Sequence, residues 1–206
     1  MDPSPPTDFQ RVLEAARRGE DGAWRALYLA HAPAVLGYLR AQRAVSPEDL
    51  VGEVWLQAVR DLHRFTGDEG GFRGWLMTIA HHRLLDARRA ATRRPVEVAE
   101  EAGYTAASSE PEAVEQVGAE QDLHRLLDGM PERQRTVLYL RYVQDMSQRE
   151  VATLLGVSTP AMKMLQARAL RALDRRVREL DAADAQASAD AGVGALPFDP
   201  EGRSRH

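Results

Sequence analysis

The 206-residue chain contains no cysteine, which excludes disulfides, thiolate nucleophiles and cysteine-ligated zinc or iron–sulfur sites. It also lacks any apolar run as long as a membrane span, so we expect no membrane insertion. The first six residues, Met1 to Pro6, contain neither a basic nor an apolar signal region. We therefore expect the protein to work in the cytoplasm.

Enzyme motifs are missing as well. The sequence has no P-loop, no dinucleotide-binding glycine pattern and no nucleophile elbow, and Gly70-Gly71 is too short to cradle a phosphate. The adjacent His81 and His82 would point about 100° apart on a helix, whereas helical metal ligands need a spacing of three or four residues. The sequence predicts no catalytic residue, no cofactor and no metal site.

Lysine is nearly absent: of the 27 basic residues only Lys163 is not arginine. The formal net charge of −4 hides an alternation along the chain. Residues 1–95 carry +2, residues 96–122 carry −8, residues 123–180 carry +5 and residues 181–206 carry −3. Two basic bodies separated by an acidic connector indicate contact with nucleic acid, although the overall pI is near 5.9.

Strand patterns are nearly absent, and helical periodicity covers most of the chain outside residues 96–118 and 181–206, which predicts an all-α fold. We expect a first helix capped by Asp8, a second from Asp21 and a third after Pro33. Ser46 and Pro47 mark the start of another helix. Its inward residues would be Leu50, Val54, Leu56 or Trp55, Ala58 and Leu62.

A glycine-rich loop at residues 66–71 precedes a helix that opens at Phe72 and repeats apolar residues at steps of three and four. Trp75 belongs to this apolar row and is interpreted as core, with a base-stacking platform as the alternative. Residues 96–118 are rich in Glu, Ala and Ser and are predicted to be a linker. A later helix from Glu132 would turn inward Val137, Leu138 and Tyr142.

The densest local signal begins at Ser147, which forms a capping-box pattern with Glu150. Gly156 stands where a left-handed residue is needed to end this helix, and Ser158 can cap the next one. A helix, a glycine-containing turn and a basic second helix are typical of the DNA-binding helix-turn-helix. A helical hairpin with a solvated basic face is the alternative. The second helix is expected to present four residues to the core, namely Met162, Leu165, Ala169 and Leu173.

Two longer blocks carry a family resemblance. The first is SPEDLVGEVWLQA at 46–58 followed by FRGWLMTIAHHRLLD at 72–86, and the second is MPERQR at 130–135, which runs into the helix-turn-helix. In this order and spacing, over residues 8–95 and 119–178, they resemble the extracytoplasmic-function (ECF) class of bacterial sigma-70 factors.

The resemblance implies two helical domains. Residues 8–95 would form a sigma-2-like domain for the polymerase clamp and the −10 element, and residues 123–180 a sigma-4-like domain for the −35 element. Residues 96–122 would be a flexible acidic linker, and residues 181–206 a disordered tail, with a docking peptide around Leu196 and Phe198 as the minority alternative. The implied partners are core RNA polymerase, promoter DNA and, in many members, an anti-sigma factor.

The resemblance also assigns residues to three surfaces. Those that would bind polymerase are Asp49, Glu53 and Gln57, where acids suit a basic partner surface and a merely solvated acidic face is the alternative. Those that would bind the −10 element are Thr66, Gly67, Asp68, Arg73, Met77, His81, His82, Arg83, Arg88 and Arg89. Those that would bind the −35 element are Arg149, Ser158, Thr159, Ala161, Lys163, Gln166, Arg168 and Arg171.

Departures from the family pattern occur at two places. Gly52 stands where the family often has glutamine, and the apolar register after Lys163 is shifted by one residue. A stand-alone helix-turn-helix regulator that binds an operator without polymerase is the alternative function. A purely protein-binding helical adaptor is a third reading, which would leave both basic faces without a role.

Overall fold

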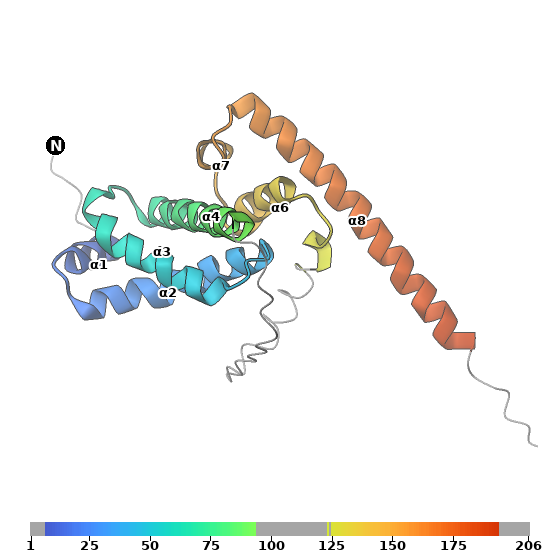
Figure 1. The fold of residues 1–206 in the computed structure, drawn as a ribbon, viewed down its shortest axis with the longest axis horizontal. Helices are drawn as coiled ribbons and strands as arrows, with labels where there is room; N and C mark the ends of the chain where they lie inside the picture. The colour runs from blue at the N-terminus through green and yellow to red at the C-terminus, as the bar shows by residue number, and fades with distance from the viewer. Residues whose placement is uncertain (1–6, 94–122, 124, 194–206) are drawn as a thin grey trace, which may run out of the picture.

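In the computed structural model, which describes residues 7–93, 123 and 125–193, every regular element of the described chain is helical (Figure 1). The predicted all-α fold is therefore confirmed. The predicted linker at residues 96–122 lies outside the described residues, as does the end of the chain from residue 194.

The N-terminal part consists of α1 (Asp8–Arg17), α2 (Asp21–Ala41), α3 (Pro47–Asp61), the short 3-10 turn η1 (Leu62–Arg64) and α4 (Glu69–Arg93). Each of the four α-helices buries an apolar stripe against its neighbours, so the helices pack as one bundle. Phe72 lies at the centre of one end, where its ring contacts Phe9, Phe65 and His31 at centroid distances of 5.2–5.7 Å. The fully buried side chains of this bundle include Leu13, Val35, Tyr38, Leu39, Val54, Leu76 and Leu84.

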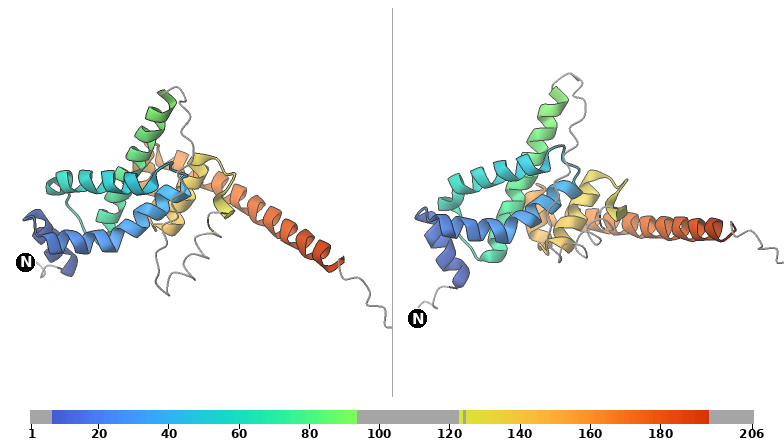
Figure 2. Two further views of the ribbon diagram at one scale, coloured as in Figure 1. Left: turned by 60° about the horizontal axis from the view of Figure 1, so that its bottom comes forward. Right: turned by 90° about the horizontal axis from the view of Figure 1, so that it is seen from below.

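The C-terminal part consists of α6 (Glu132–Leu138), a π-helical turn η2 (Tyr139–Val143), α7 (Gln148–Leu154) and α8 (Thr159–Val193). Helices α6 and α7 both pack on the first part of α8, and α7 also contacts α4. The rest of α8 projects away from both helical parts (Figures 1 and 2). The buried side chains of this part include Val137, Leu140, Val151, Met162 and Ala169.

The first two N-terminal helices each differ from the prediction in one place. The cap of α1 is Thr7 rather than Asp8, because the Thr7 hydroxyl accepts a hydrogen bond from the Gln10 N–H at 3.3 Å. Helix α2 continues through Pro33 instead of restarting there. Pro33 cannot donate a backbone hydrogen bond within the helix. Packing of the helix before and after Pro33 outweighs this loss, because Leu27 and Val35 are buried in the same core.

Helices α3 and α4 also differ from the prediction, in how α3 is capped and in where α4 begins. Ser46 precedes α3 but makes no side-chain cap bond, so Pro47 at the first turn is the start signal that the structure uses. Of the two candidates for the inward position, Trp55 is buried and Leu56 is 60% exposed. Helix α4 begins at Glu69, three residues before Phe72, within the glycine-rich segment.

Two predictions for the C-terminal part are wrong. Tyr142 is 55% exposed rather than buried, because the π turn at residues 139–143 inserts an extra residue and rotates the later side chains outward. Helix α8 continues to Val193, so residues 181–193 are helical where a disordered tail was expected. No helix within the described residues is long and apolar enough to cross a membrane.

Candidate nucleic-acid interface

The helix-turn-helix forms as its sequence signals predict. Ser147 Oγ accepts from the Glu150 N–H at 3.2 Å, and Glu150 Oε2 accepts from the Ser147 N–H at 2.6 Å, which completes the capping box. Gly156 has φ +63°, a left-handed conformation that lets the chain turn between α7 and α8. Ser158 then caps α8, since its hydroxyl accepts from the Ala161 N–H at 3.3 Å.

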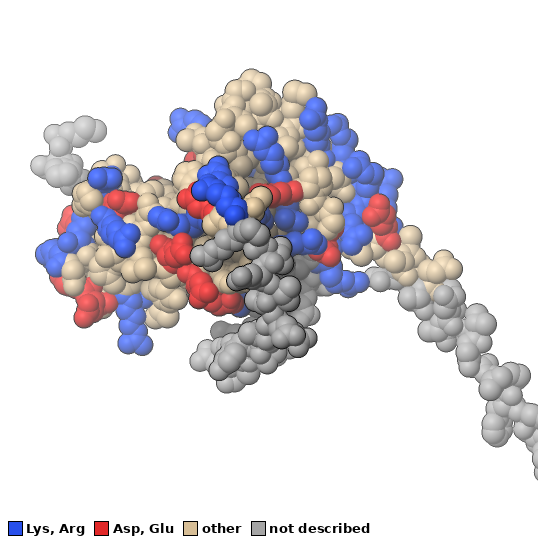
Figure 3. Space-filling model, in the orientation of Figure 1, with Lys and Arg blue, Asp and Glu red and all other residues tan. Residues whose placement is uncertain are grey.

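The N-terminal turns of α8 present a solvent-exposed face. Most residues predicted for −35 contact are exposed, namely Arg149, Ser158, Thr159, Ala161, Lys163, Arg168 and Arg171. Arg175 and Arg178 continue the same side at steps of four and three residues, and basic side chains follow α8 in the space-filling view (Figure 3). A positive face of this kind suits the phosphates of nucleic acid.

Gln166 differs from the other predicted −35 residues because both ends of its amide are occupied. Its Oε1 accepts from Gln148 Nε2 at 2.9 Å, and its Nε2 donates to the Tyr142 hydroxyl at 2.8 Å. The side chain therefore ties α8 to α7 and to the π turn. Tyr142 and Gln148 were missed by sequence reasoning, since the only available signal, a polar residue at each position, is common on any exposed helix.

The acidic row of α3 lies beside α4. Asp49 and Glu53 are exposed and line a groove of about 310 Å³ together with Arg43 and Arg88. Gln57 is half-buried, because it donates to Asp61 Oδ2 at 3.1 Å and accepts from Arg83 of α4. The structure therefore leaves the two carboxylates free to face a partner and holds the amide within the domain.

The loop before α4 has a defined conformation. Asp68 Oδ1 accepts from the Gly71 N–H at 2.8 Å, and the Gly67 carbonyl accepts from Gln10 Nε2 of α1 at 2.8 Å. Gly67 has φ +154°, and a Cβ there would lie 3.1 Å from the Phe65 ring. The loop residues predicted for −10 contact, Thr66, Gly67 and Asp68, are all exposed.

Two of the residues predicted for −10 contact do not reach the surface. Met77 is completely buried in the bundle core, and His81 is only 7% exposed. The His81 ring meets the Tyr38 hydroxyl, with 2.8 Å between Nδ1 and the oxygen. Burial lowers the pKa of His81 to about 4, and the charges of His82 and Arg88 act in the same direction. The face of α4 that carries these two residues packs inward.

The other predicted −10 residues of α4 are accessible to different degrees. His82 and Arg89 are exposed, whereas Arg73, Arg83 and Arg88 are half-buried. Arg89 forms an ion pair with Asp86 at 3.0 Å. Arg88 donates to the Gln42 carbonyl and forms an ion pair with Glu132 of α6.

Two grooves lie where α4 faces the C-terminal part. One, of about 640 Å³, is lined by His82, Arg89 and Glu132 among others, and the second, of about 440 Å³, by Trp75 and Arg149 among others. The Trp75 ring packs on the rings of Phe65 and Phe72, with centroid distances of 5.3 and 5.5 Å, as expected for a core residue. The same side chain also borders the second groove. Within the described residues, no group of three His, Asp or Glu side chains is close enough to hold a metal ion.

The chain matches two protein-family models. The model described as Sigma-70 region 2 matches residues 27–94, and the model described as Sigma-70, region 4 matches residues 120–173. Among curated proteins, the chain is similar to the ECF RNA polymerase sigma factor SigD of Mycobacterium tuberculosis, with 32% identity over 79% of this chain and 80% of SigD. It is also similar to the ECF RNA polymerase sigma factor BldN of Streptomyces coelicolor, with 31% identity over 84% of this chain and 68% of BldN.

A solved structure shares the fold. The sigma factor RpoE in complex with the anti-sigma factor NepR from Bartonella quintana matches 75% of this chain and 96% of that chain, with 19% identity and a TM-score of 0.56.

Proposed function

Because this chain belongs to the ECF class of sigma-70 factors, we propose that it joins core RNA polymerase, recognises the −35 and −10 promoter elements and promotes DNA melting. The chemistry of RNA synthesis belongs to the polymerase, so the chain itself needs no catalytic residue. Its place of action is the cytoplasm, where polymerase and DNA meet. The observation that carries the proposal is a capped helix-turn-helix in the same chain as a sigma-type region 2.

Polymerase binding is assigned to the exposed carboxylates of α3. Asp49 and Glu53 stand one helical turn apart on the same face, so both can meet one basic surface at once. Complementary charge of this kind raises the association rate and fixes the orientation of the partner. Gln57 supports this face from within, since Arg83 and Asp61 hold its amide.

Recognition of the −10 element is assigned to the loop at residues 66–68 and the exposed side of α4. Melting requires bases to leave the stack, and a protein offsets that cost by holding single-stranded bases while cations contact the backbone. Arg83, Arg88 and Arg89 supply such cations along α4. Met77 and His81 lie in the core beneath this surface and support it by packing.

Recognition of the −35 element is assigned to the start of α8. Ser158, Thr159 and Ala161 stand at its N-terminus, where a recognition helix meets base edges. Arg149 of α7 and Arg171 of α8 flank these residues and suit phosphate contacts.

The partners follow from this assignment. Core polymerase and promoter DNA are the working partners, and an anti-sigma factor, such as the one bound to the Bartonella RpoE, is the expected inhibitor. The acidic segment 96–122 would tether the two domains within the complex, because a chain without basic residues avoids the DNA on either side.

Charge reversal on α3 tests the proposal. We expect Asp49→Arg/Glu53→Arg to lose at least about tenfold in run-off transcription with core polymerase, since two attractive charges become repulsive. The matched control is Glu14→Arg/Glu20→Arg, which makes the same charge change at exposed positions near α1 and should transcribe normally. Normal transcription by the α3 variant would refute the polymerase assignment.

A further inference from the structure

Helix α1 ends before residue 27, where the match to Sigma-70 region 2 begins, so the family match does not include it. It packs on α2 and lies beside the segment that joins α3 to α4 (Figure 1). That segment carries the loop at residues 66–68, which is assigned above to the −10 element. Any contact from α1 to this loop therefore bears on how the −10 element is read.

Two side chains of α1 donate hydrogen bonds to the carbonyls of the residues on either side of Thr66. Gln10 Nε2 donates to the Gly67 carbonyl at 2.8 Å, and Arg17 Nη2 donates to the Phe65 carbonyl. Gln10 and Arg17 stand two helical turns apart, so both extend from the same side of α1. We call these two side chains the α1 brace. The exposed side chain of Thr66 is presented between the two carbonyls that the brace holds.

Other contacts fix the two ends of the loop. At its start, the buried Phe65 ring lies 5.4 Å from the Phe72 ring, which the Phe9 ring of α1 also contacts at 5.7 Å. At its end, Asp68 Oδ1 accepts from the Gly71 N–H at 2.8 Å in the first turn of α4. Between these anchors, the α1 brace supplies hydrogen bonds to the loop backbone.

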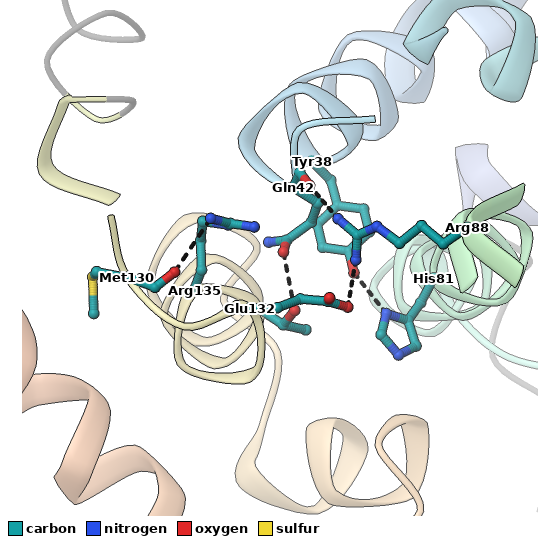
Figure 4. Close-up of polar contacts among 8 residues, drawn as sticks. Tyr38, Gln42, His81, Arg88, Met130, Glu132 and Arg135 are labelled. Atoms are coloured by element: carbon teal, nitrogen blue, oxygen red, sulfur yellow. Dashed lines mark hydrogen bonds and ion pairs between the residues drawn. The ribbon is translucent and has the colours of Figure 1, made fainter. Parts of the chain in front are cut away.

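The later part of α4 is held by α2 rather than by α1. His81 lies about 18 Å along α4 from its first residue, Glu69, and its ring meets the Tyr38 hydroxyl at 2.8 Å. Arg88 donates to the Gln42 carbonyl one turn after the end of α2 begins to fray, and Figure 4 shows these side chains meeting from the two helices. A change in the α1 brace therefore alters the loop without releasing the later part of α4 from the bundle.

We propose that Gln10 and Arg17 are positioning residues, which hold the loop at residues 66–68 ready to capture an unstacked base of the −10 element. This inference rests on the function proposed above. A loop that already has its binding conformation loses less conformational entropy when it captures a base, and its affinity is higher for that reason. Because both side chains bond the loop backbone, they act on DNA through the loop rather than by contact.

Substitutions on α1 separate the brace from its surroundings. Gln10→Leu removes one donor at nearly constant volume and without a change of charge, and Arg17→Ala removes the other donor. The matched control is Arg18→Ala, which makes the same charge change at the next exposed residue, where the side chain pairs with Glu20. Arg17→Lys is the conservative variant, because it keeps a donor and the positive charge.

Hydrogen exchange in the free, full-length chain measures the brace without polymerase or DNA. The Gly71 amide reports opening of the loop, because its partner is the side chain of Asp68. We expect Gln10→Leu to speed exchange of this amide about threefold to tenfold, since the loss of one bond makes local opening easier. Arg18→Ala should exchange like wild type. Unchanged exchange in Gln10→Leu/Arg17→Ala would overturn the proposal.

Binding of a single-stranded −10 oligonucleotide by the polymerase complex tests what the brace does. Gln10→Leu and Arg17→Ala should each weaken this binding about threefold to tenfold, while the affinities for a −35 duplex and for core polymerase stay at wild-type values. Arg17→Lys should retain most of the wild-type affinity. Equal losses in all three affinities would show a merely structural role and refute the assignment, as would full −10 affinity in the double variant.

A double-mutant cycle tests whether the brace acts through Thr66. In a Thr66→Ala background, the effect of Gln10→Leu on −10 binding should fall to about half or less, whereas fully additive effects would contradict the proposal. A wild-type complex that ignores the −10 strand would refute the proposed function itself. The exchange measurement is independent of that outcome, so failure of the brace and failure of the function are distinguished.

Discussion

At the residue scale, Gln166 has a role that its place on the recognition helix does not suggest. A glutamine on the outward side of α8 predicts a base contact, yet both ends of its amide are bonded within the domain, to Gln148 and Tyr142. Positioning of α8 against α7 and the π turn explains both bonds. A direct reading role would require the amide to leave them.

Tyr142→Phe separates these two roles, because it removes one bond to Gln166 without altering a DNA-facing atom. We expect it to weaken −35 binding by about threefold to tenfold, roughly equally on all base substitutions in the element. The measurement is holoenzyme binding to a panel of −35 variants, with Gln166→Ala in parallel. A loss confined to one base position in Gln166→Ala, together with a neutral Tyr142→Phe, would show that Gln166 reads a base.

His81 predicts a pH dependence of stability. Its pKa in the fold is about 4, whereas the unfolded ring titrates near the ordinary value of 6.5. Between these values the unfolded chain binds more protons than the folded chain. The contribution of His81 to the free energy of unfolding is therefore fully present above pH 6.5 and is lost as the pH falls towards 4. We expect His81→Gln to show a shallower loss over this window in urea unfolding.

The exposed neighbour gives the control for this prediction. His82→Gln keeps the buried ring and should retain most of the pH dependence. Buried His31, whose pKa is also lowered mainly by burial, contributes equally to wild type and to both variants. An identical pH dependence in wild type and His81→Gln would contradict the assignment.

The sequence could not place His81 or Met77 correctly because both lie on a helix with several apolar faces. Met77 and His81 stand four residues apart on α4, on a side that the family resemblance led us to expect in contact with the −10 element. Their burial depends on α2, which brings Tyr38 against His81. Such contacts between distant segments leave no periodic signal in one sequence.

At the scale of elements, local signals predicted the helix ends of the helix-turn-helix, but not the caps of α1 and α3 or the start of α4. Ser147, Glu150 and Gly156 act as predicted, because caps and left-handed turns depend on a few neighbouring residues. Pro33 was expected to start a helix and instead lies within α2. Continuity there is set by burial on both sides, which is a property of the assembled bundle.

Two glycines offer a matched test of backbone conformation. Gly156 has φ +63°, so Gly156→Ala should destabilise the C-terminal domain by about 1–2 kcal/mol, although nothing lies within 4 Å of the added Cβ. Gly52 lies inside α3 with equally open surroundings, so Gly52→Ala should stabilise the chain by about 0.5–1 kcal/mol. Urea unfolding measures both, and the opposite order of effects would contradict this account of the turn.

At the scale of the whole molecule, charge is distributed by domain and by segment. The acidic segment 96–122 and the negative end of the chain offset the two basic bodies, so the net charge is −4. We expect the isolated chain to bind duplex DNA weakly, since the whole chain is net acidic and Arg88 is already paired with Glu132.

This prediction is checked by gel shift at moderate salt with the free chain and with the polymerase complex. The complex should bind a promoter duplex at least about a hundredfold more tightly than the free chain, because polymerase holds both domains at the required separation. Tight, sequence-specific binding by the free chain would indicate the alternative, a stand-alone regulator.

The central claim is that this chain confers promoter specificity on core RNA polymerase. The direct measurement is gel filtration of the chain with core polymerase, followed by transcription of fragmented genomic DNA and mapping of RNA 5′ ends. We predict co-elution and transcripts that start a fixed distance downstream of one shared pair of sequence elements. A chain that elutes apart from polymerase and binds an inverted-repeat duplex by itself would contradict the claim.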